Sequence, residues 1–356
     1  MPRSTFPAVI SFSDRNEEST LVTDKPNDTE EDFAKLIAEA VDVQEIDINL
    51  YMSKELWLPL GARGAFGGQI VAQALRAAFN TVPEEYHIHS LHSYFILPGN
   101  VEIPVIYHVQ RLRDGRSFVT RSVTATQKGR AIFICSFSFA KQDDSISLNH
   151  QTIMPEVADP ETLPSDTERL QQYLANNELS PKMREYIQKR IEESSPVDYR
   201  DLDVARQEDV FLSDKLAASE VSRRWFKTRG QLGDDARLHA CIIAYASDSG
   251  FIGTAARANG VPQRQIGMMA SLDHSMWFHA PARADKWLLY DIRSPRTNSG
   301  RGVVLGSIYS RDGTLIATTA QEGIVRLSKK EQERRANQAG SSSETSLPKS
   351  GHASKL

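Results

Sequence analysis

The stretch Phe66–Phe79 reads FGGQIVAQALRAAF, and the stretch Leu238–Asp248 reads LHACIIAYASD. Apolar residues, many of them alanine, lie on almost every side of both segments when they are drawn as helices. A helix that is apolar all round is a buried helix, and small residues let a sheet wrap closely around it. The chain therefore predicts two buried central helices.

Strand-like segments accompany each predicted helix. The first helix is followed by runs at about 87–97, 103–113, 116–127 and 130–140. The second helix is accompanied by runs at about 220–229, 266–279, 286–293, 301–310 and 314–326. Strands that follow a helix without strand–helix alternation indicate the α+β class with an antiparallel sheet.

An internal repeat relates the two halves of the chain. The segment Ser90–Ser93 (SLHS) recurs as Ser271–Ser275 (SLDHS) with one insertion. The two helices align without gaps from Gly68 and from Ala240. Two copies of one sheet-wrapped helix predict an intramolecular pseudo-dimer with a cleft where the copies meet.

The length of 356 residues fits two domains, at the usual size of ~100–200 residues each. We expect a disordered tail at 1–38, an N-terminal domain at 39–142, a helical connector at 143–195, a C-terminal domain at 196–327 and a flexible tail at 328–356.

Composition and charge exclude several classes of protein. The net charge of −4 gives no basic footprint, so nucleic acid is not an expected partner. No apolar run approaches the ~18 residues that span a bilayer. Cys135 and Cys241 each lie in an apolar segment and are expected to be buried, reduced thiols. Without a C-x-x-C pair or a Cys/His cluster, the sequence predicts no metal site and no cofactor.

The last three residues are Ser354, Lys355 and Leu356. A terminal S-K-L is an address read by the peroxisomal import receptor; the alternative is a chance match. The polar run before it is rich in Gly, Ser, Thr and Lys, which predicts a flexible tether. We therefore expect the import receptor as a partner and the peroxisomal matrix as the location.

Alignment of the halves shows an asymmetry in polar residues. The aligned pairs are Asp248 with Arg76, Gln321 with Phe137, and Ser271 with Ser90. Two of the three polar side chains therefore exist only in the second copy. If the fold brings the three together, the chain carries one active site, in its C-terminal domain.

Asp248 is the first candidate for catalysis. An ionised carboxylate at the end of an apolar helix is costly unless it is paired or functional. The alternative is a cap, in which the carboxylate accepts hydrogen bonds from the backbone N–H groups of residues 249–251.

Ser271 and Gln321 are the other two candidates. Strict alternation places Ser271 on the strand face that carries Asp273 and Ser275, with His274 on the opposite face; the alternative is a hydroxyl that only fills a half-polar face. Gln321 ends an apolar strand face, where a buried amide needs partners; the alternative is a satisfied amide on an edge strand.

Histidines and a glycine pair leave further alternatives open. Strand histidines such as His89 suggest a Ser–His hydrolase, but the chain has no G-x-S-x-G nucleophile elbow, and a lone strand histidine is more often a structural hydrogen-bonding group. Gly67 and Gly68 offer backbone N–H groups at a helix N-terminus, which suit a developing oxyanion. The alternative for these two glycines is that they only allow helix entry and close packing.

His89 is a further candidate for contact with the substrate.

The motifs together resemble the type II acyl-CoA thioesterases, which include bacterial thioesterase II and peroxisomal enzymes of fungi and animals. The resemblance covers about Tyr51 through Arg326. It rests on six motifs: Phe66–Gln69, His89–Phe95, Leu112–Gly115, Tyr245–Asp248, Leu272–His279 and Gln321–Gly323.

This resemblance implies a double hot-dog fold, an acyl-CoA substrate and a catalytic trio that maps onto Asp248, Ser271 and Gln321. Bacterial members resemble Thr at the middle position, and Ser there is similar to the peroxisomal branch. Hot-dog sheets often associate further in this family, so a homo-oligomer is also implied. The implied reaction is hydrolysis of the thioester by a directly activated water.

Two other functions remain open at this point. A hot-dog enoyl-CoA hydratase would resemble a Gly-Asp-x-Asn-Pro-x-His context, which the sequence lacks. A non-catalytic acyl-CoA-binding protein is the other possibility. The observation against it is that all three polar positions, Asp248, Ser271 and Gln321, are filled in one half.

Overall fold

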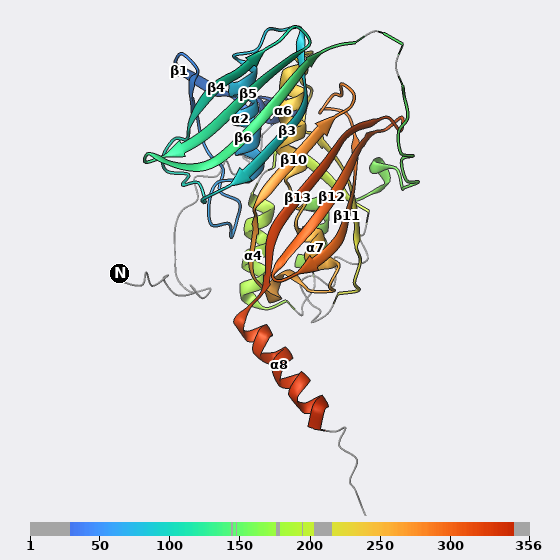
Figure 1. The fold of residues 1–356 in the computed structure, drawn as a ribbon. Helices are drawn as coiled ribbons and strands as arrows, with labels where there is room; N and C mark the ends of the chain where they lie inside the picture. Colours follow the sequence, from blue (N-terminus) through green and yellow to red (C-terminus); the bar gives the residue numbers. More distant parts are fainter. Residues whose placement is uncertain are drawn as a thin grey trace, which may run out of the picture.

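The computed structural model describes residues 29–344, except 144, 147, 176–178, 194 and 203–215. Its centre is one antiparallel sheet of 13 strands that runs through both halves of the chain (Figure 1). Two helices, one from each half, pack against the inner face of this sheet. The α+β class and the pair of buried central helices are thus as predicted.

Each half contributes one helix and its own set of strands. The first half contains α1 (Glu30–Val41), β1 (Val43–Asp47), β2 (Leu50–Ser53), α2 (Gly67–Phe79), β3 (Tyr86–Phe95), β4 (Ile106–Asp114), β5 (Phe118–Gln127) and β6 (Arg130–Lys141). The segment between the halves contains η1 (Pro160–Thr162), α3 (Asp166–Leu174) and α4 (Pro181–Glu192).

The second half repeats this plan. It contains β7 (Val197–Asp201), β8 (Val221–Thr228), α6 (Ala236–Ser247), α7 (Gly253–Arg257), η2 (Gln263–Gln265), β9 (Ile266–Ser271), β10 (Asp273–Phe278), β11 (Leu288–Asn298), β12 (Arg301–Ser310) and β13 (Leu315–Leu327). The last element is α8 (Lys329–Glu344), which extends away from the body of the molecule (Figure 1).

Strands β3 and β10 join the two halves. The strand order is β1-β2-β4-β5-β6-β3-β10-β13-β12-β11-β8-β7, with β9 also paired to β13. Ser93 lies opposite His274 and His92 lies opposite Ser275 at the joint. Because these residues belong to the repeated SLHS and SLDHS segments, the joint lies where the two copies meet.

The hairpin between β5 and β6 shows how local sequence closes the sheet. Lys128 and Gly129 have φ angles of 50° and 71°. Positive φ at both central residues is the geometry of a two-residue turn whose twist matches the flanking strands.

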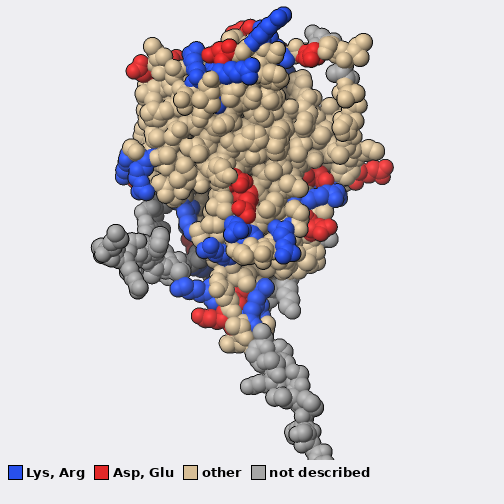
Figure 2. All heavy atoms as spheres, in the orientation of Figure 1, with Lys and Arg blue, Asp and Glu red and all other residues tan. Residues whose placement is uncertain are grey.

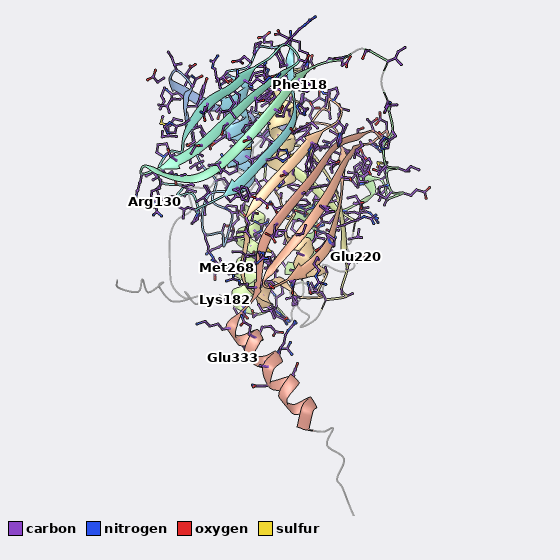
Figure 3. The ribbon with its side chains drawn as sticks, viewed as in Figure 1. Phe118, Arg130, Lys182, Glu220, Met268 and Glu333 are labelled. Carbon is purple, nitrogen blue, oxygen red and sulfur yellow. The ribbon has the colours of Figure 1, made fainter. Side chains whose placement is uncertain are left out.

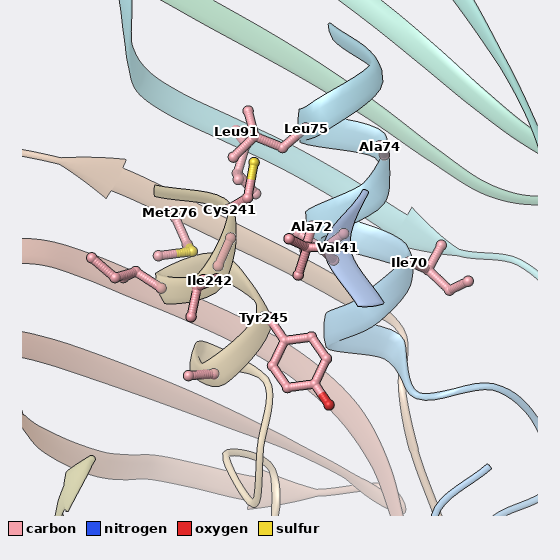
Figure 4. Close-up of a cluster of buried hydrophobic side chains, with 14 of the residues drawn as sticks. Val41, Ile70, Ala72, Ala74, Leu75, Leu91, Cys241, Ile242, Tyr245 and Met276 are labelled. Atoms are coloured by element: carbon pink, nitrogen blue, oxygen red, sulfur yellow. The ribbon is translucent and has the colours of Figure 1, made fainter. Parts of the chain in front are cut away.

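The core lies between the two central helices and the sheet. Leu75 of α2, Cys241 of α6 and Met276 of β10 are fully buried and meet in this cluster (Figure 4). Cys135 and Cys241 are both free and buried, as predicted. Burial raises the pKa of the Cys241 thiol to about 12, so this thiol is protonated and unreactive at neutral pH.

Two predictions about the tails are wrong in part. Residues 30–38 are not tail but belong to α1, which begins with a capping box between Thr29 and Asp32. Phe33 and Ile37, four residues apart, are buried against the rest of the protein, and this apolar stripe anchors the helix. Residues 329–344 form α8 rather than irregular chain.

One broad face of the sheet carries few charged side chains, which gather mainly at the ends of the molecule (Figure 2). The described helices include none with the length and apolar character required to cross a membrane.

The packing of α1 predicts a measurable stability effect. Ile37 is fully buried, so Ile37→Ala should lower the free energy of unfolding by about 2–5 kcal/mol. Urea unfolding measures this change. The control is Lys35→Ala on the exposed side of the same helix, with an expected change within about 0.5 kcal/mol; equal effects of the two substitutions would show that α1 is not anchored by its apolar stripe.

Candidate active site

The ends of the two central helices meet at the interior of the molecule. A Cβ atom added at Gly67, the first residue of α2, would lie 2.7 Å from Asp248 Oδ2. Asp248 is the C-terminal cap residue of α6. At the other ends of the helices, Arg237 of α6 donates a hydrogen bond to the carbonyl oxygen of Phe79 in α2 (2.9 Å). The helices are therefore antiparallel, and the Asp248 carboxylate lies against the N-terminus of α2.

The glycine pair permits this close approach. A Cβ atom at Gly68 would lie 2.3 Å from the carbonyl oxygen of Tyr245 and 2.6 Å from the ring of Phe66. No side chain larger than hydrogen fits there without movement of the α6 backbone. The structure thus supports the alternative of close packing for this glycine pair.

The Asp248 side chain bonds to β13 and does not act as a helix cap. Gln321 Nε2 donates a hydrogen bond to Asp248 Oδ1 at 2.7 Å. Among the described residues, no backbone N–H group at 249–251 donates to the Asp248 carboxylate. The cap interpretation of Asp248 is therefore not supported by its contacts.

Gln321 lies in the interior and not on an edge strand. Its strand β13 pairs with both β10 and β12, and Gln321 is only 1% exposed. Its side-chain oxygen Oε1 is buried and has no hydrogen-bond partner within the described part of the chain. An unpaired buried acceptor is costly, which distinguishes Oε1 from the amide nitrogen, whose partners are in place.

A change of register places Ser271 on the same face as Gln321. Ser271 lies opposite Gly323 of β13, whereas Ser275 lies opposite Ala320. The two pairings differ by one residue, so the strand has a bulge between β9 and β10, where Leu272 N–H donates to the carbonyl oxygen of Glu322 (2.9 Å).

The predicted strict alternation through this segment is consequently wrong. Residues directly opposite in an antiparallel pair share a face, so Ser271 shares the inner face with Gly323 and Gln321. Diagonal neighbours of this kind lie about 7–8 Å apart. The Ser271 hydroxyl has no hydrogen-bond partner among the described residues and is half-buried.

His274, which the sequence analysis placed on the strand face opposite Ser271, is a buried member of this group. It is fully buried, and its Nδ1 atom lies 3.2 Å from Gln321 Nε2. Its Nε2 atom lies 2.9 Å from Ser247 Oγ in the last turn of α6. Burial lowers the pKa of His274, and the Asp248 carboxylate opposes this shift. The aligned SLDHS repeat contained the residue, but nothing in the sequence showed its partners.

His89 is not brought to this group. His89 Nε2 lies 2.8 Å from Ser138 Oγ, and its ring contacts Phe118 edge-on at 5.6 Å between centroids. Phe118 and Arg130 mark opposite ends of the first half of the sheet (Figure 3). The ring of Phe95, by contrast, would be 3.0 Å from a Cβ atom at Gly67. Six residues of strand, about 20 Å, separate His89 from Phe95, which removes His89 from the candidate site.

The equivalent position in the first half is closed by ion pairs. Arg76, which aligns with Asp248, contacts Asp235 at the N-terminus of α6 (3.4 Å) and Asp42 (3.5 Å). Phe137, which aligns with Gln321, is fully buried. Among the residues that the structure describes, a carboxylate bonded to an amide at a helix N-terminus is thus found in the second half and not at the aligned positions of the first.

The described residues contain no group of three or more His, Cys, Asp or Glu that could hold a metal ion. The polar groups at the site are a carboxylate, an amide, an imidazole, a hydroxyl and a helix N-terminus. Such a set can orient and deprotonate a water molecule and stabilise an oxyanion.

Comparison with known proteins identifies the family. An acyl-CoA thioesterase family model matches residues 198–324, and a model of the acyl-CoA thioesterase N-terminal domain matches residues 54–140. The chain is 41% identical to acyl-coenzyme A thioesterase 8 of Mus musculus over 82% of this chain and 89% of that protein. This chain belongs to the acyl-CoA thioesterase family. It is an acyl-CoA thioesterase, a hydrolase of acyl-CoA thioesters.

Other relatives agree with this assignment. The chain is 28% identical to the peroxisomal acyl-coenzyme A thioester hydrolase 1 of Saccharomyces cerevisiae over 75% of this chain and 87% of that protein. The crystal structure of acyl-CoA thioesterase II TesB2 from Mycobacterium marinum is similar, with a TM-score of 0.64 and 33% identity over 82% of this chain and 99% of that one. A hot-dog-fold protein from Alicyclobacillus acidocaldarius, 19% identical with a TM-score of 0.62, shares the fold over 82% of this chain and 98% of that one. The thioesterase therefore has the double hot-dog fold that the resemblance implied.

The contact between Gly67 and Asp248 predicts an effect of a single methyl group. Gly67→Ala should push the carboxylate away from the α2 N-terminus and lower kcat by about tenfold or more, because small displacements of catalytic groups are costly. Thiol release from an acyl-CoA measures the rate. The control is Gly253→Ala at the first residue of α7, where an added Cβ meets no atom within 4 Å. Unchanged turnover by the Gly67→Ala protein would contradict the proposed closeness.

Proposed function

We propose that this thioesterase hydrolyses its substrate by direct attack of a water molecule that Asp248 activates. The observation that carries the proposal is the hydrogen bond between Gln321 Nε2 and Asp248 Oδ1, located at the N-terminus of α2. It places a buried amide and a carboxylate side by side, and the amide oxygen has no hydrogen-bond donor among the described residues.

The chemistry needs no covalent enzyme intermediate. A thioester carbonyl carbon is electrophilic, and a thiolate is a good leaving group. Asp248 takes a proton from the water molecule while the water oxygen forms a bond to the carbonyl carbon. The carbon–sulfur bond then breaks, and the proton passes to the thiolate, which gives the free acid and coenzyme A. Gln321 and Ser271 orient the water through hydrogen bonds.

The N-terminus of α2 supplies the electrostatic part of the mechanism. Helix N-termini carry partial positive charge and free N–H groups. Within the described residues the N–H groups of Gly67 and Gly68 have no acceptor, and the N-cap residue Phe66 makes no side-chain cap. These N–H groups stabilise the negative charge that develops on the carbonyl oxygen.

The test of this mechanism is Asp248→Asn. The substituted amide oxygen still accepts from Gln321, so the fold should persist, while the loss of the base should lower kcat by about 100-fold or more. Thiol release from palmitoyl-CoA measures turnover, and circular dichroism checks the fold. The control is Asp273→Asn, whose half-buried carboxylate accepts from the Glu322 N–H group (2.7 Å) on the other face of the sheet. Wild-type turnover in a folded Asp248→Asn protein would end the proposal.

We also propose that the enzyme works in the peroxisomal matrix on fatty acyl-CoA. Support comes from the terminal Ser354-Lys355-Leu356 sequence, since a C-terminal S-K-L is read by the import receptor. The name of the yeast relative gives the same compartment for that protein. These three residues lie outside the described part of the chain.

Deletion of residues 354–356 tests the location. The truncated enzyme should retain full thiol release in vitro, because the site lies between α2, α6 and β13, and should spread through the cytosol in cells. Fluorescence microscopy against a peroxisomal marker distinguishes the outcomes. If the truncated protein stays in puncta that overlap the marker, these residues are not the address.

A further inference from the structure

We propose that His274 is a positioning residue that fixes the orientation of the Gln321 amide, so that the amide oxygen rather than its NH₂ group faces the attacking water. This inference rests on the proposed function, because it assigns a role within the water site of Asp248 and Gln321. It follows from a chain of hydrogen bonds that runs from Ser247 through His274 to the Gln321 amide, which donates to the Asp248 carboxylate.

The chain begins at Ser247 in the last turn of α6. Its hydroxyl donates to the carbonyl oxygen of Ala244 at 2.8 Å, and its other neighbour, Met276 Sδ at 3.2 Å, is also only an acceptor. The single hydroxyl proton is therefore used. With that proton directed at Ala244, the oxygen of Ser247 accepts from His274 Nε2, 2.9 Å away.

This contact determines the tautomer of His274. If Nε2 carries the proton, Nδ1 of the neutral ring has a lone pair and accepts. Burial lowers the pKa of His274, so the neutral form is maintained at neutral pH. The edge of the neighbouring Phe251 ring, 5.8 Å away between centroids, holds the imidazole in place from the other side.

Gln321 is the next member of the chain. Its amide nitrogen lies 3.2 Å from His274 Nδ1 and 2.7 Å from Asp248 Oδ1. Both neighbours are acceptors, so the amide donates one proton to each of them. If the amide were reversed, its oxygen would face two acceptor atoms and no donor. The amide oxygen Oε1 therefore points away from both groups, buried and without a partner in the described part of the chain.

An acceptor at this place has a chemical purpose. A water molecule that donates one proton to Asp248 and the other to Gln321 Oε1 keeps a lone pair directed at the thioester carbon. An NH₂ group in the place of Oε1 would bind that lone pair and oppose the attack. His274 thus acts through Gln321 and makes no contact with the reacting atoms.

Two substitutions at one position separate this role from simple packing. His274→Asn places a carbonyl oxygen at the δ1 position and keeps the acceptor, whereas His274→Leu removes it at similar bulk. We expect His274→Leu to lower kcat by about tenfold or more with KM changed by less than about twofold, because only transition-state positioning is lost. His274→Asn should restore kcat to within about threefold of the wild-type value.

A double-mutant cycle with Gln321→Ala shows whether His274 acts through the amide. If it does, His274→Leu should cause no further loss in the Gln321→Ala background, since interacting residues are non-additive. Multiplying effects, or equal losses for His274→Leu and His274→Asn, would overturn the inference. If His274→Leu only damaged the fold, its loss of kcat would multiply with the loss caused by Gln321→Ala.

Ser247→Ala provides a second route if His274→Leu does not fold. It removes the hydroxyl that fixes the tautomer but leaves the ring in place. We expect kcat to fall about threefold or more, again without further loss in the Gln321→Ala background, and an additive loss would overturn the inference. Measurement of Asp248→Asn in the same assay separates the two claims. If Asp248→Asn retains activity, the water mechanism is wrong. If Asp248→Asn is inactive and the double-mutant cycle is additive, only the role of His274 is wrong.

Discussion

The antiparallel contact between α2 and α6 is the constraint on which the proposed active site depends. It brings the C-terminal end of one helix, with Asp248, against the N-terminal end of the other, with Gly67. The N-terminal end of α2 carries partial positive charge and attracts the carboxylate, whereas the C-terminal end of α6 carries partial negative charge and opposes it. Since Gly68 lies against the Tyr245 carbonyl oxygen, the approach requires residues without side chains at the start of α2.

The sheet completes the site through two features of the second half. Central strand β13 carries Gln321 into the interior, and the bulge between β9 and β10 turns Ser271 to the same face. Bulges commonly redirect a side chain next to an active site. The hydroxyl and the amide thus lie on one face of the sheet, and the amide bonds to the carboxylate at the end of α6.

We propose a site in the second half alone because, among the described residues, the two copies differ at the helix ends. In the second half, a carboxylate and an amide occupy the junction. In the first half, Arg76 forms ion pairs with Asp42 and Asp235, and Phe137 fills the position of the amide. A cation paired at a helix N-terminus offers no base, and a buried phenylalanine offers no acceptor for a water molecule.

The sequence by itself determined the two buried helices, most strands, the duplication and the candidates Asp248 and Gln321, because each depends on local periodicity or on comparison of the two halves. It missed α1, since a short amphipathic helix at 30–41 is stabilised by contacts with distant segments. Only the tertiary structure decided which face Ser271 occupies, that His274 contacts Gln321, and that His89 lies elsewhere. A bulge depends on the register between paired strands, and hydrogen-bond partners far apart in the chain leave no local pattern.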